Sequence, residues 1–287
     1  MSIKAPAVDT LNSQNTGRRA FNETSDPRAY VPRDDTESAL SELAAWAQGD
    51  GEGSTVGVLI GPPGLGKTFL LRVFESRVAR ESLYLPYAGL PPVELIAWIY
   101  GLLGRSRAVD VDLENPEAES GQQLGPLLDL ASDRQSPFFL IIDDADSMPA
   151  DTLRMFVEEL PPEGSSLRIL MAMNEDAKSS RLLAGLDSLR PYVVRIQSAM
   201  TETETAHYVH ARLAWAGASP AELARLDAES TRRIFALSGG VPQAVHRIAG
   251  ALFAGDGMAL PSDLDAKQRR ENWMGRPFED DPVEPES

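Results

Sequence analysis

Gly61-Pro62-Pro63-Gly64-Leu65-Gly66-Lys67-Thr68 satisfies the pattern G-x-x-x-x-G-K-S/T, which is typical of a phosphate-binding loop. The three glycines allow the backbone to curl so that several N–H groups point at one anion. We expect a helix that opens near Gly66 to add the positive end of its dipole. Lys67 is then expected to neutralise the β- and γ-phosphates of a nucleotide, and the Thr68 hydroxyl to ligate Mg²⁺. The pattern therefore predicts a site for ATP and Mg²⁺.

The residues on either side of this loop have the context that such a loop requires. Thr55–Ile60 is a short apolar run of the kind found in buried strands, and Phe69–Val78 has helical spacing of its apolar residues. A phosphate-binding loop joins a strand to a helix, so the flanks support the motif.

Strands and helices go on alternating downstream of the loop. The further predicted strands are Ser82–Tyr87, Phe138–Ile142, Leu167–Met173 and Val193–Gln197. The predicted helices among them are Pro92–Leu103, Leu124–Leu130 and Ala150–Leu160. Such alternation is typical of a parallel sheet that helices cover on both faces. We therefore expect an α/β fold of the P-loop NTPase kind.

Polar residues follow two of the predicted strands. Asp143 and Asp144 come directly after the apolar run Phe138–Ile142, at the end of the strand where open α/β sheets bind ligands. We expect Asp143 to hold Mg²⁺ through water and Asp144 to polarise the attacking water. Asn174 ends the run Leu167–Met173 and is expected to orient water near the γ-phosphate. The competing interpretation of Asn174 is a simple strand-terminating residue.

The pattern changes after residue 200, where only helices are predicted. They are Thr201–Trp215, Pro220–Leu226, Ala228–Leu237 and Val241–Phe253. We therefore divide the chain into a flexible N-terminal arm (1–23), an α/β nucleotide-binding domain (24–198), a small all-helical lid (199–256) and a disordered acidic tail (257–287).

Composition and charge exclude several classes of function. The chain has 43 acidic and 27 basic side chains and a net charge of −16, which makes generic nucleic-acid binding less favourable. It has no cysteine, so disulfides, thiol catalysis and cysteine-based zinc sites are excluded. Residues 1–30 lack the apolar core of a signal peptide, and no apolar run approaches the ~20 residues that span a bilayer. We therefore expect a cytoplasmic protein.

Taken together, these motifs resemble the layout of AAA+ ATPases: a phosphate-binding loop, an acidic strand end, a polar strand end at Asn174 and a helical lid. A closer likeness is to the general secretion pathway protein A (ExeA-type) group of AAA ATPases, over roughly residues 20–255. The segments that resemble this group are Asp26–Arg33, Asp143–Asp146 with Met148-Pro149, Glu204–Val209 with Arg212-Leu213 and Ala216-Gly217, and Gly239–Pro242.

The resemblance implies hydrolysis of ATP to ADP and phosphate, with protein partners. Proteins of this group often also carry a membrane span and a cell-wall-binding part, and we expect neither from this sequence. It also implies an arginine that stabilises charge on the γ-phosphate bound by a neighbouring subunit. Arg190, just before the fifth predicted strand, fits this role best, and Arg181 and Arg195 are alternatives. If Arg190 acts in this way, the chain self-associates through it. The competing interpretation is an exposed arginine in an ordinary ion pair.

The sequence departs from the family's pattern in two places. The family usually has Glu where this chain has Asp144, and the shorter carboxylate predicts slower activation of water. Paired Asp does occur in the related DnaA-type initiators, so hydrolysis remains compatible with it. The family has Arg where this chain has Gln243, which offers no charged donor to phosphate. Arg247, one helical turn further on, is a candidate substitute.

Three functions are compatible with these motifs. The first is a slow ATPase whose nucleotide state controls a protein assembly, as in the ExeA-type group. The second is a DNA-linked AAA+ regulator of the transposition or initiator type, which the paired aspartates allow and the charge of −16 opposes. The third is a nucleotide switch that does not hydrolyse ATP, which differs from the first in whether phosphate release exceeds that of an Asp144→Ala control.

Overall fold

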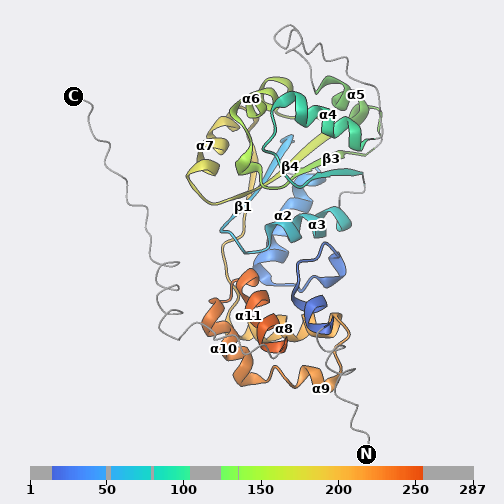
Figure 1. Cartoon of the computed structure of the whole chain (residues 1–287). Helices are drawn as coiled ribbons and strands as arrows, with labels where there is room; N and C mark the ends of the chain where they lie inside the picture. Colours follow the sequence, from blue (N-terminus) through green and yellow to red (C-terminus); the bar gives the residue numbers. More distant parts are fainter. Residues whose placement is uncertain (1–14, 50–52, 79–80, 104–123, 135, 255–287) are drawn as a thin grey trace, which may run out of the picture. The chain divides into compact units, whose positions relative to one another are not determined.

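A computed structural model describes residues 15–49, 53–78, 81–103, 124–134 and 136–254 (Figure 1). The described chain divides into two compact units, one formed by residues 24–198 and the other by residues 15–23 together with those from 199 onward. The tail expected over 257–287 and the first fourteen residues of the expected arm lie outside the described residues.

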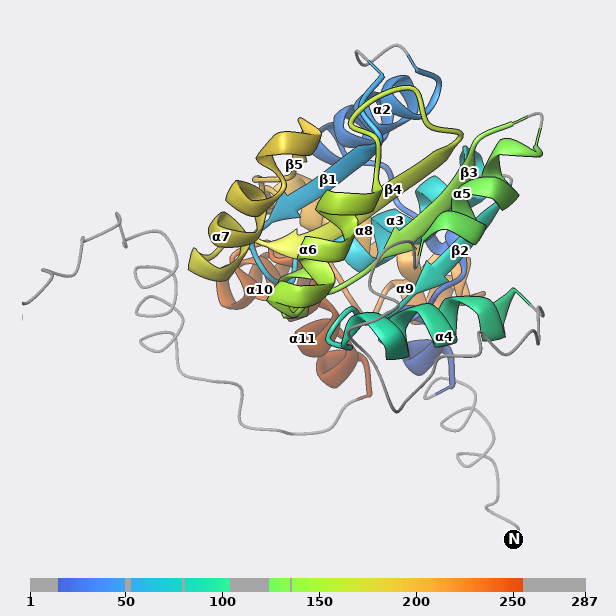
Figure 2. The same ribbon diagram turned by 90° about the horizontal axis from the view of Figure 1, so that it is seen from above.

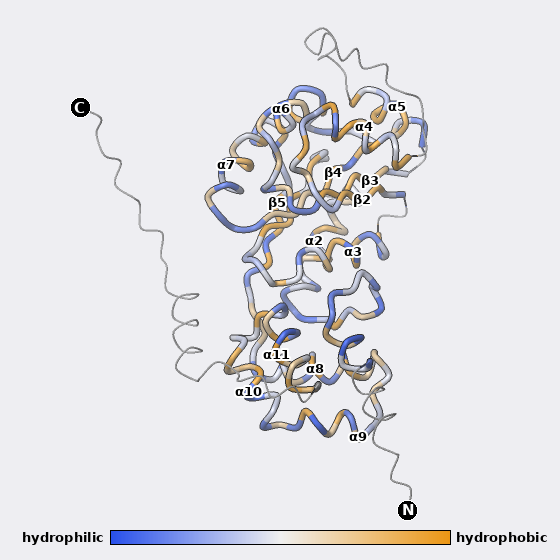
Figure 3. The backbone as a smooth tube through the Cα atoms, viewed as in Figure 1, coloured by the Kyte–Doolittle hydropathy of each residue, from blue (hydrophilic) through white to orange (hydrophobic). Residues whose placement is uncertain are grey.

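The unit of residues 24–198 contains a sheet of five parallel strands in the order β2-β3-β4-β1-β5. The strands are β1 Val56–Gly61, β2 Ser82–Leu85, β3 Phe138–Ile142, β4 Leu167–Asn174 and β5 Tyr192–Arg195. The predicted α/β class is confirmed. All residues of β1 and β3 are buried, because helices cover both faces of the sheet, and β3 and β4 accordingly appear as apolar segments in Figure 3.

Helices of the described part of the chain pack on both faces of the sheet (Figure 2). On the first face Trp46 of α2 (Asp34–Ala47) and Phe74 of α3 (Lys67–Arg77) pack against Phe139. On the second face, the apolar side chains of four helices pack against Phe138, Leu140 and their neighbours. These helices are α4 Pro92–Leu102, α5 Gly125–Ser132, α6 Ala150–Glu159 and α7 Ala177–Gly185.

The buried indole ring of Trp46 anchors α2 to the sheet. Trp46 is fully buried, and its Nε1 donates to the carbonyl oxygen of Ser54 at 2.9 Å. A β-carbon at Gly57 would lie 3.0 Å from the indole ring, so a glycine at this position of β1 lets the large side chain lie flat against the strand.

The second unit contains the predicted helices, which run as α8 Glu202–Trp215, α9 Pro220–Leu223, α10 Ala228–Ser238 and α11 Pro242–Ala254. The first helix begins with a capping box, in which the side chain of Thr201 accepts from the Glu204 N–H and the Glu204 carboxylate accepts from the Thr201 N–H. Among the described residues, every helix falls short of the length and apolar character that crossing a bilayer requires.

Part of the expected flexible arm belongs to this helical unit. Residues 15–21 are helical, and Ala20 and Phe21 are buried in the apolar core that α8, α10 and α11 share. The buried guanidinium of Arg212 donates to the Ala20 carbonyl at 2.8 Å, and the Phe21 ring meets the His246 ring edge-on. The arm prediction is therefore wrong for these residues. Two apolar side chains make no periodic pattern, and their burial depends on a surface about 190 positions away in the sequence.

Candidate nucleotide-binding site

The phosphate-binding loop predicted at Gly61–Thr68 connects β1 directly to α3. Gly64 and Gly66 have φ values of 81° and 94°, in the left-handed region that favours glycine. Gly61 is required for a different reason, since a β-carbon there would lie 2.3 Å from the carbonyl oxygen of Ile196. The first helical hydrogen bond runs from Leu70 N to Gly66 O, so the earlier N–H groups of α3 have no partner within the helix. These groups and the open space beside Gly66 form a cradle that suits an anion.

Lys67 lies buried at the start of α3 and donates to three oxygens. Its Nζ is 2.8 Å from Gly61 O, 3.0 Å from Pro62 O and 2.9 Å from Asn174 Oδ1. Burial lowers the pKa of Lys67 below its ordinary value, and the nearby carboxylates of Asp146 and Asp143 oppose that shift. An ammonium has three N–H donors, so contact with a phosphate requires Lys67 to exchange at least one of these bonds.

Asn174 lies opposite Gly61 in the register of β1 and β4, at the carboxyl edge of the sheet. Its Oδ1 accepts from Lys67, and its Nδ2 donates to Asp146 Oδ2 at 2.9 Å. The structure thus brings the predicted residue Asn174 to the predicted loop. It adds Asp146, to which the sequence analysis assigned no role. The feature of the sequence that could have indicated Asp146 is its position in the turn directly after Asp143 and Asp144.

Asp143 follows β3 and is buried, with 5% of its surface exposed. Its Oδ1 accepts the backbone N–H of Asp144 at 3.0 Å, and its Oδ2 accepts the hydroxyl of Tyr84 at 2.8 Å. Burial raises the pKa of Tyr84 above its ordinary value, so this phenol stays protonated and remains a donor. Sequence reasoning missed Tyr84, because its relation to Asp143 depends on β2 pairing with β3.

Asp144 is exposed and has a left-handed backbone, with φ 46° and ψ 43°. Aspartate and asparagine tolerate this conformation better than most residues with a β-carbon. Partial desolvation of its carboxyl group, followed by the charges of Asp143 and Asp146, raises the pKa of Asp144, while Lys67 opposes the rise. A carboxylate with a raised pKa accepts a proton more readily, and the role of Asp144 as a general base stays a prediction.

The oxygen groups of the site suit Mg²⁺ with a nucleotide. Thr68 is exposed in the first turn of α3. A hydroxyl and a carboxylate are the hard oxygen ligands that Mg²⁺ prefers, and a lysine with helix N–H groups suits the phosphates. The residues that would hold the metal and the nucleotide are therefore Thr68 and Asp143 for Mg²⁺ and Gly61–Thr68 for the phosphates.

The three candidate arginines lie in different places. Arg190 is exposed and pairs with Glu163 at 3.1 Å. It precedes β5 and so lies at the amino edge of the sheet, whereas the phosphate-binding loop lies at the carboxyl edge. It therefore lies away from the phosphate-binding loop of its own chain, and a role toward a neighbouring subunit stays a prediction. Arg195 pairs in register with Ile60, near the loop, and Arg181 is exposed on α7. Gln243 and Arg247 are both exposed on α11 of the helical unit.

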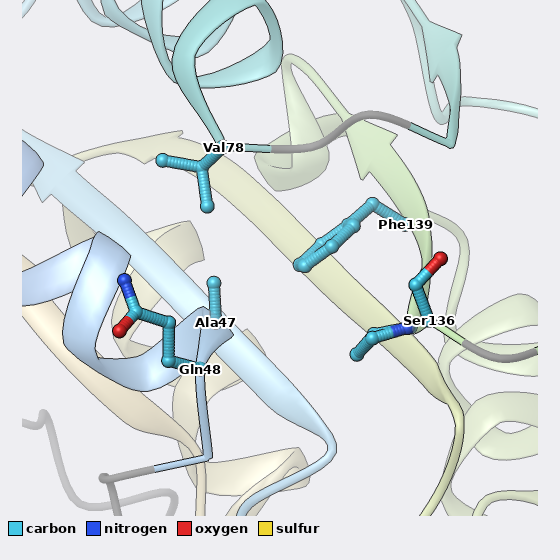
Figure 4. Close-up of a pocket in the computed structure, with 6 residues that line it drawn as sticks. Ala47, Gln48, Val78, Ser136 and Phe139 are labelled. Atoms are coloured by element: carbon cyan, nitrogen blue, oxygen red, sulfur yellow. The ribbon is translucent and has the colours of Figure 1, made fainter.

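A hollow elsewhere in the α/β unit does not coincide with this site (Figure 4). It is lined by Ala47, Gln48, Val78, Ser136, Pro137 and Phe139. Gln48 and Val78 directly follow α2 and α3, and Phe139 is near the start of β3, so the hollow lies at the amino edge of the sheet. The phosphate-binding loop, Asp143, Asp144 and Asn174 are at the carboxyl edge.

Comparison with known proteins agrees with the fold of the α/β unit. Residues 50–192 match the family model described as an AAA domain. No curated protein sequence matches the chain. The Walker-type ATPase PABY2304 of Pyrococcus abyssi is similar in structure, with a TM-score of 0.52 and 15% identity over 83% of this chain and 71% of that one. Drosophila ORC bound to DNA is also similar, with a TM-score of 0.58 and 17% identity over 96% of this chain and 70% of that one. At these identities the likeness shows the fold.

Proposed function

We propose that this chain, whose α/β unit has the P-loop NTPase fold of AAA proteins, binds ATP with Mg²⁺ and hydrolyses it slowly. The observation that carries the proposal is the contact of Lys67 with Asn174 at the sheet edge where Asp143 and Asp144 also lie. These are the groups expected to bind phosphate, place water and accept its proton. They come from the start of α3, the end of β4 and the turn after β3, and they meet only through the fold.

Each residue has a distinct part in the proposed reaction. The backbone of Gly61–Thr68 and the ammonium of Lys67 hold the phosphates. Thr68 and Asp143 hold Mg²⁺, which when bound neutralises charge on the β- and γ-phosphates. Asn174 orients the attacking water, and Asp144 accepts its proton.

We propose that ATP hydrolysis is slow and that the protein acts through which nucleotide is bound, not through repeated turnover. Asp144 is shorter by one methylene than the glutamate of the family that the sequence resembles, and Gln243 offers no cation to the phosphate. We propose that the bound nucleotide controls contacts with protein partners, including other copies of this chain through Arg190. In this respect the protein would act like the ExeA-type ATPases.

Binding is tested with Lys67→Ala and a matched control, Lys178→Ala, which removes an exposed lysine on α7. Loss of the ammonium should abolish ATP binding in isothermal titration, while the control binds like the wild type. Thermal unfolding of both variants shows whether the buried site still folds. An ATP affinity that is the same in Lys67→Ala and the wild type would refute the proposal.

Hydrolysis is tested with Asp144→Asn, because asparagine keeps the size of the side chain and tolerates the left-handed backbone. The variant should bind ATP with unchanged affinity and lose phosphate release by about 10²-fold or more, as expected when a general base is removed. If wild-type phosphate release is no faster than that of the variant, the protein is a nucleotide switch that does not hydrolyse ATP.

A DNA-linked function is the second candidate, and the likeness of fold to Drosophila ORC bound to DNA favours it. The net charge of −16 opposes it, because such a surface repels phosphates at long range. Electrophoretic shift of duplex DNA with and without ATP tests this candidate. ATP-dependent binding that weakens steeply with salt would favour it over control of a protein assembly.

A further inference from the structure

A tyrosine on the edge strand of the sheet holds the carboxylate expected to bind Mg²⁺. Tyr84 lies on β2, and its hydroxyl donates to Asp143 Oδ2 at 2.8 Å. The backbone ladder of β2 and β3 continues to this point, since Asp143 N donates to Leu85 O at 2.8 Å. The strand therefore fixes both the backbone and the side chain of Asp143.

Each oxygen of the Asp143 carboxylate has a donor from the protein. Oδ1 accepts the Asp144 N–H at 3.0 Å, and Oδ2 accepts the Tyr84 hydroxyl. A carboxylate held by two donors has one preferred orientation. Each of its oxygens still has a second lone pair, so the carboxylate keeps the capacity to accept from water bound to a metal.

The ring of Tyr84 is itself held by the helix that follows the phosphate-binding loop. The guanidinium of Arg72 on α3 lies over the ring, 3.2 Å from its centroid. Arg72 pairs with Glu75 at 3.0 Å, and Ser82 of β2 donates to the same carboxylate at 3.0 Å. This chain of contacts joins α3, which begins at Lys67, to the strand that holds Asp143.

We propose that Tyr84 is a positioning residue for Mg²⁺, acting through the orientation of the Asp143 carboxylate. This inference rests on the proposed function. Mg²⁺ dehydrates reluctantly and keeps several of its waters in protein sites. The strength with which a carboxylate holds the metal through water depends on the orientation of the carboxylate. Asp143 must accept from the Tyr84 hydroxyl and from the metal-bound water at the same time. Removing the partner of a metal ligand typically weakens metal binding by about 10- to 100-fold.

The test substitution is Tyr84→Phe, which removes only the hydroxyl and keeps the ring under Arg72. Its matched control is Tyr87→Phe, since Tyr87 is a nearby tyrosine with 46% of its surface exposed. Binding of a fluorescent ATP analogue is titrated at a series of MgCl₂ concentrations and in EDTA. We expect Tyr84→Phe to raise the half-saturating Mg²⁺ concentration by about tenfold. Binding in EDTA should not change, and the control should behave like the wild type.

An unchanged or lower half-saturating Mg²⁺ concentration in Tyr84→Phe would overturn the inference. Failure of the wild type to bind the analogue at any Mg²⁺ concentration would instead refute the proposed function. If Tyr84→Phe does not fold, Arg72→Gln replaces it, because loss of the guanidinium frees the ring while leaving the hydroxyl. The same direction of shift is then expected, and its absence contradicts the proposal.

Discussion

The ammonium of Lys67 and the side-chain amide of Asn174 lie 2.9 Å apart, although 107 positions separate them in the sequence. The other end of the amide is held by Asp146, whose Oδ2 accepts from Nδ2 at 2.9 Å. The three side chains form a continuous chain of hydrogen bonds from the acidic turn after β3 to the phosphate-binding loop. Asp146 therefore determines which end of the amide faces Lys67.

From these hydrogen bonds we expect Asp146 and Asn174 to act as one unit in hydrolysis. Asn174→Ala should lower kcat by about 10²-fold, the loss typical of removing one preorganised polar group. ATP affinity should change little, because Lys67 retains two backbone acceptors. Asp146→Ala should lower kcat less, and the double variant should be no slower than Asn174→Ala. Strictly additive losses in kcat would contradict a shared role.

Arg190 offers a test of action between subunits. Arg190→Ala should reduce ATP hydrolysis by about 10³-fold if the guanidinium completes a neighbour's site. Glu163→Gln is the matched control, since it breaks the same exposed ion pair but keeps the arginine. Mixing Arg190→Ala with Asp144→Asn should restore activity, because each supplies what the other lacks. Equal effects of Arg190→Ala and Glu163→Gln would instead indicate an ordinary ion pair.

Gly240 has a strict requirement for glycine in the helical unit. Its φ is 76°, and a β-carbon there would lie 1.9 Å from the carbonyl oxygen of Met200. Gly239 also has a left-handed backbone, with φ 61°, but a β-carbon there meets nothing within 4 Å. We expect Gly240→Ala to lower the free energy of unfolding by about 2 kcal/mol more than Gly239→Ala does. Denaturant unfolding measures the difference, and equal losses would show that the turn relaxes around the added carbon.

The environment of His246 leads us to expect that the free energy of unfolding falls in acid. Burial, followed by the charge of Arg212, lowers its pKa to about 4, while a hydrogen bond that the ring donates to the backbone of Phe21 opposes the shift. The Nε2 atom of His246 lies 2.8 Å from the Tyr208 hydroxyl. The unfolded chain has the ordinary value of about 6.5, so it binds the proton more readily than the folded chain. His246 therefore does not lower the free energy of unfolding above pH ~6.5. As the pH drops from ~6.5 to ~4, protonation of this histidine in the unfolded chain lowers the free energy of unfolding by at most about 3 kcal/mol.

The measurement that checks this is NMR titration of the three histidine rings, together with unfolding at pH 7 and pH 5. One ring should titrate near pH 4, and its signal should be missing in His246→Gln. His207→Gln removes an exposed histidine from α8 and should leave the acid loss of stability unchanged. If the signal that is missing in His246→Gln titrates near pH 6.5 in the wild type, the prediction is contradicted.

Local patterns in the sequence predicted the loop and most of the elements. Gly61–Thr68 combines a backbone requirement with a cation and a hydroxyl, and this combination is recognisable without neighbours. Phe138–Ile142 was predicted with its observed bounds, since a strand buried on both faces is apolar throughout. In contrast, α7 was not predicted, because its nine residues include few strongly apolar side chains and only Ser179 and Leu182 are buried.

The sequence by itself determined that a phosphate-binding loop lies between a strand and a helix, and that acidic and amide residues end two further strands. The tertiary structure alone decided that Asn174 reaches Lys67, that Tyr84 reaches Asp143 and that residues 15–21 join the helical unit. Each of these contacts joins segments far apart in the chain. They depend on the strand order β2-β3-β4-β1-β5 and on the packing of remote surfaces, which the periodicity of a single segment does not encode.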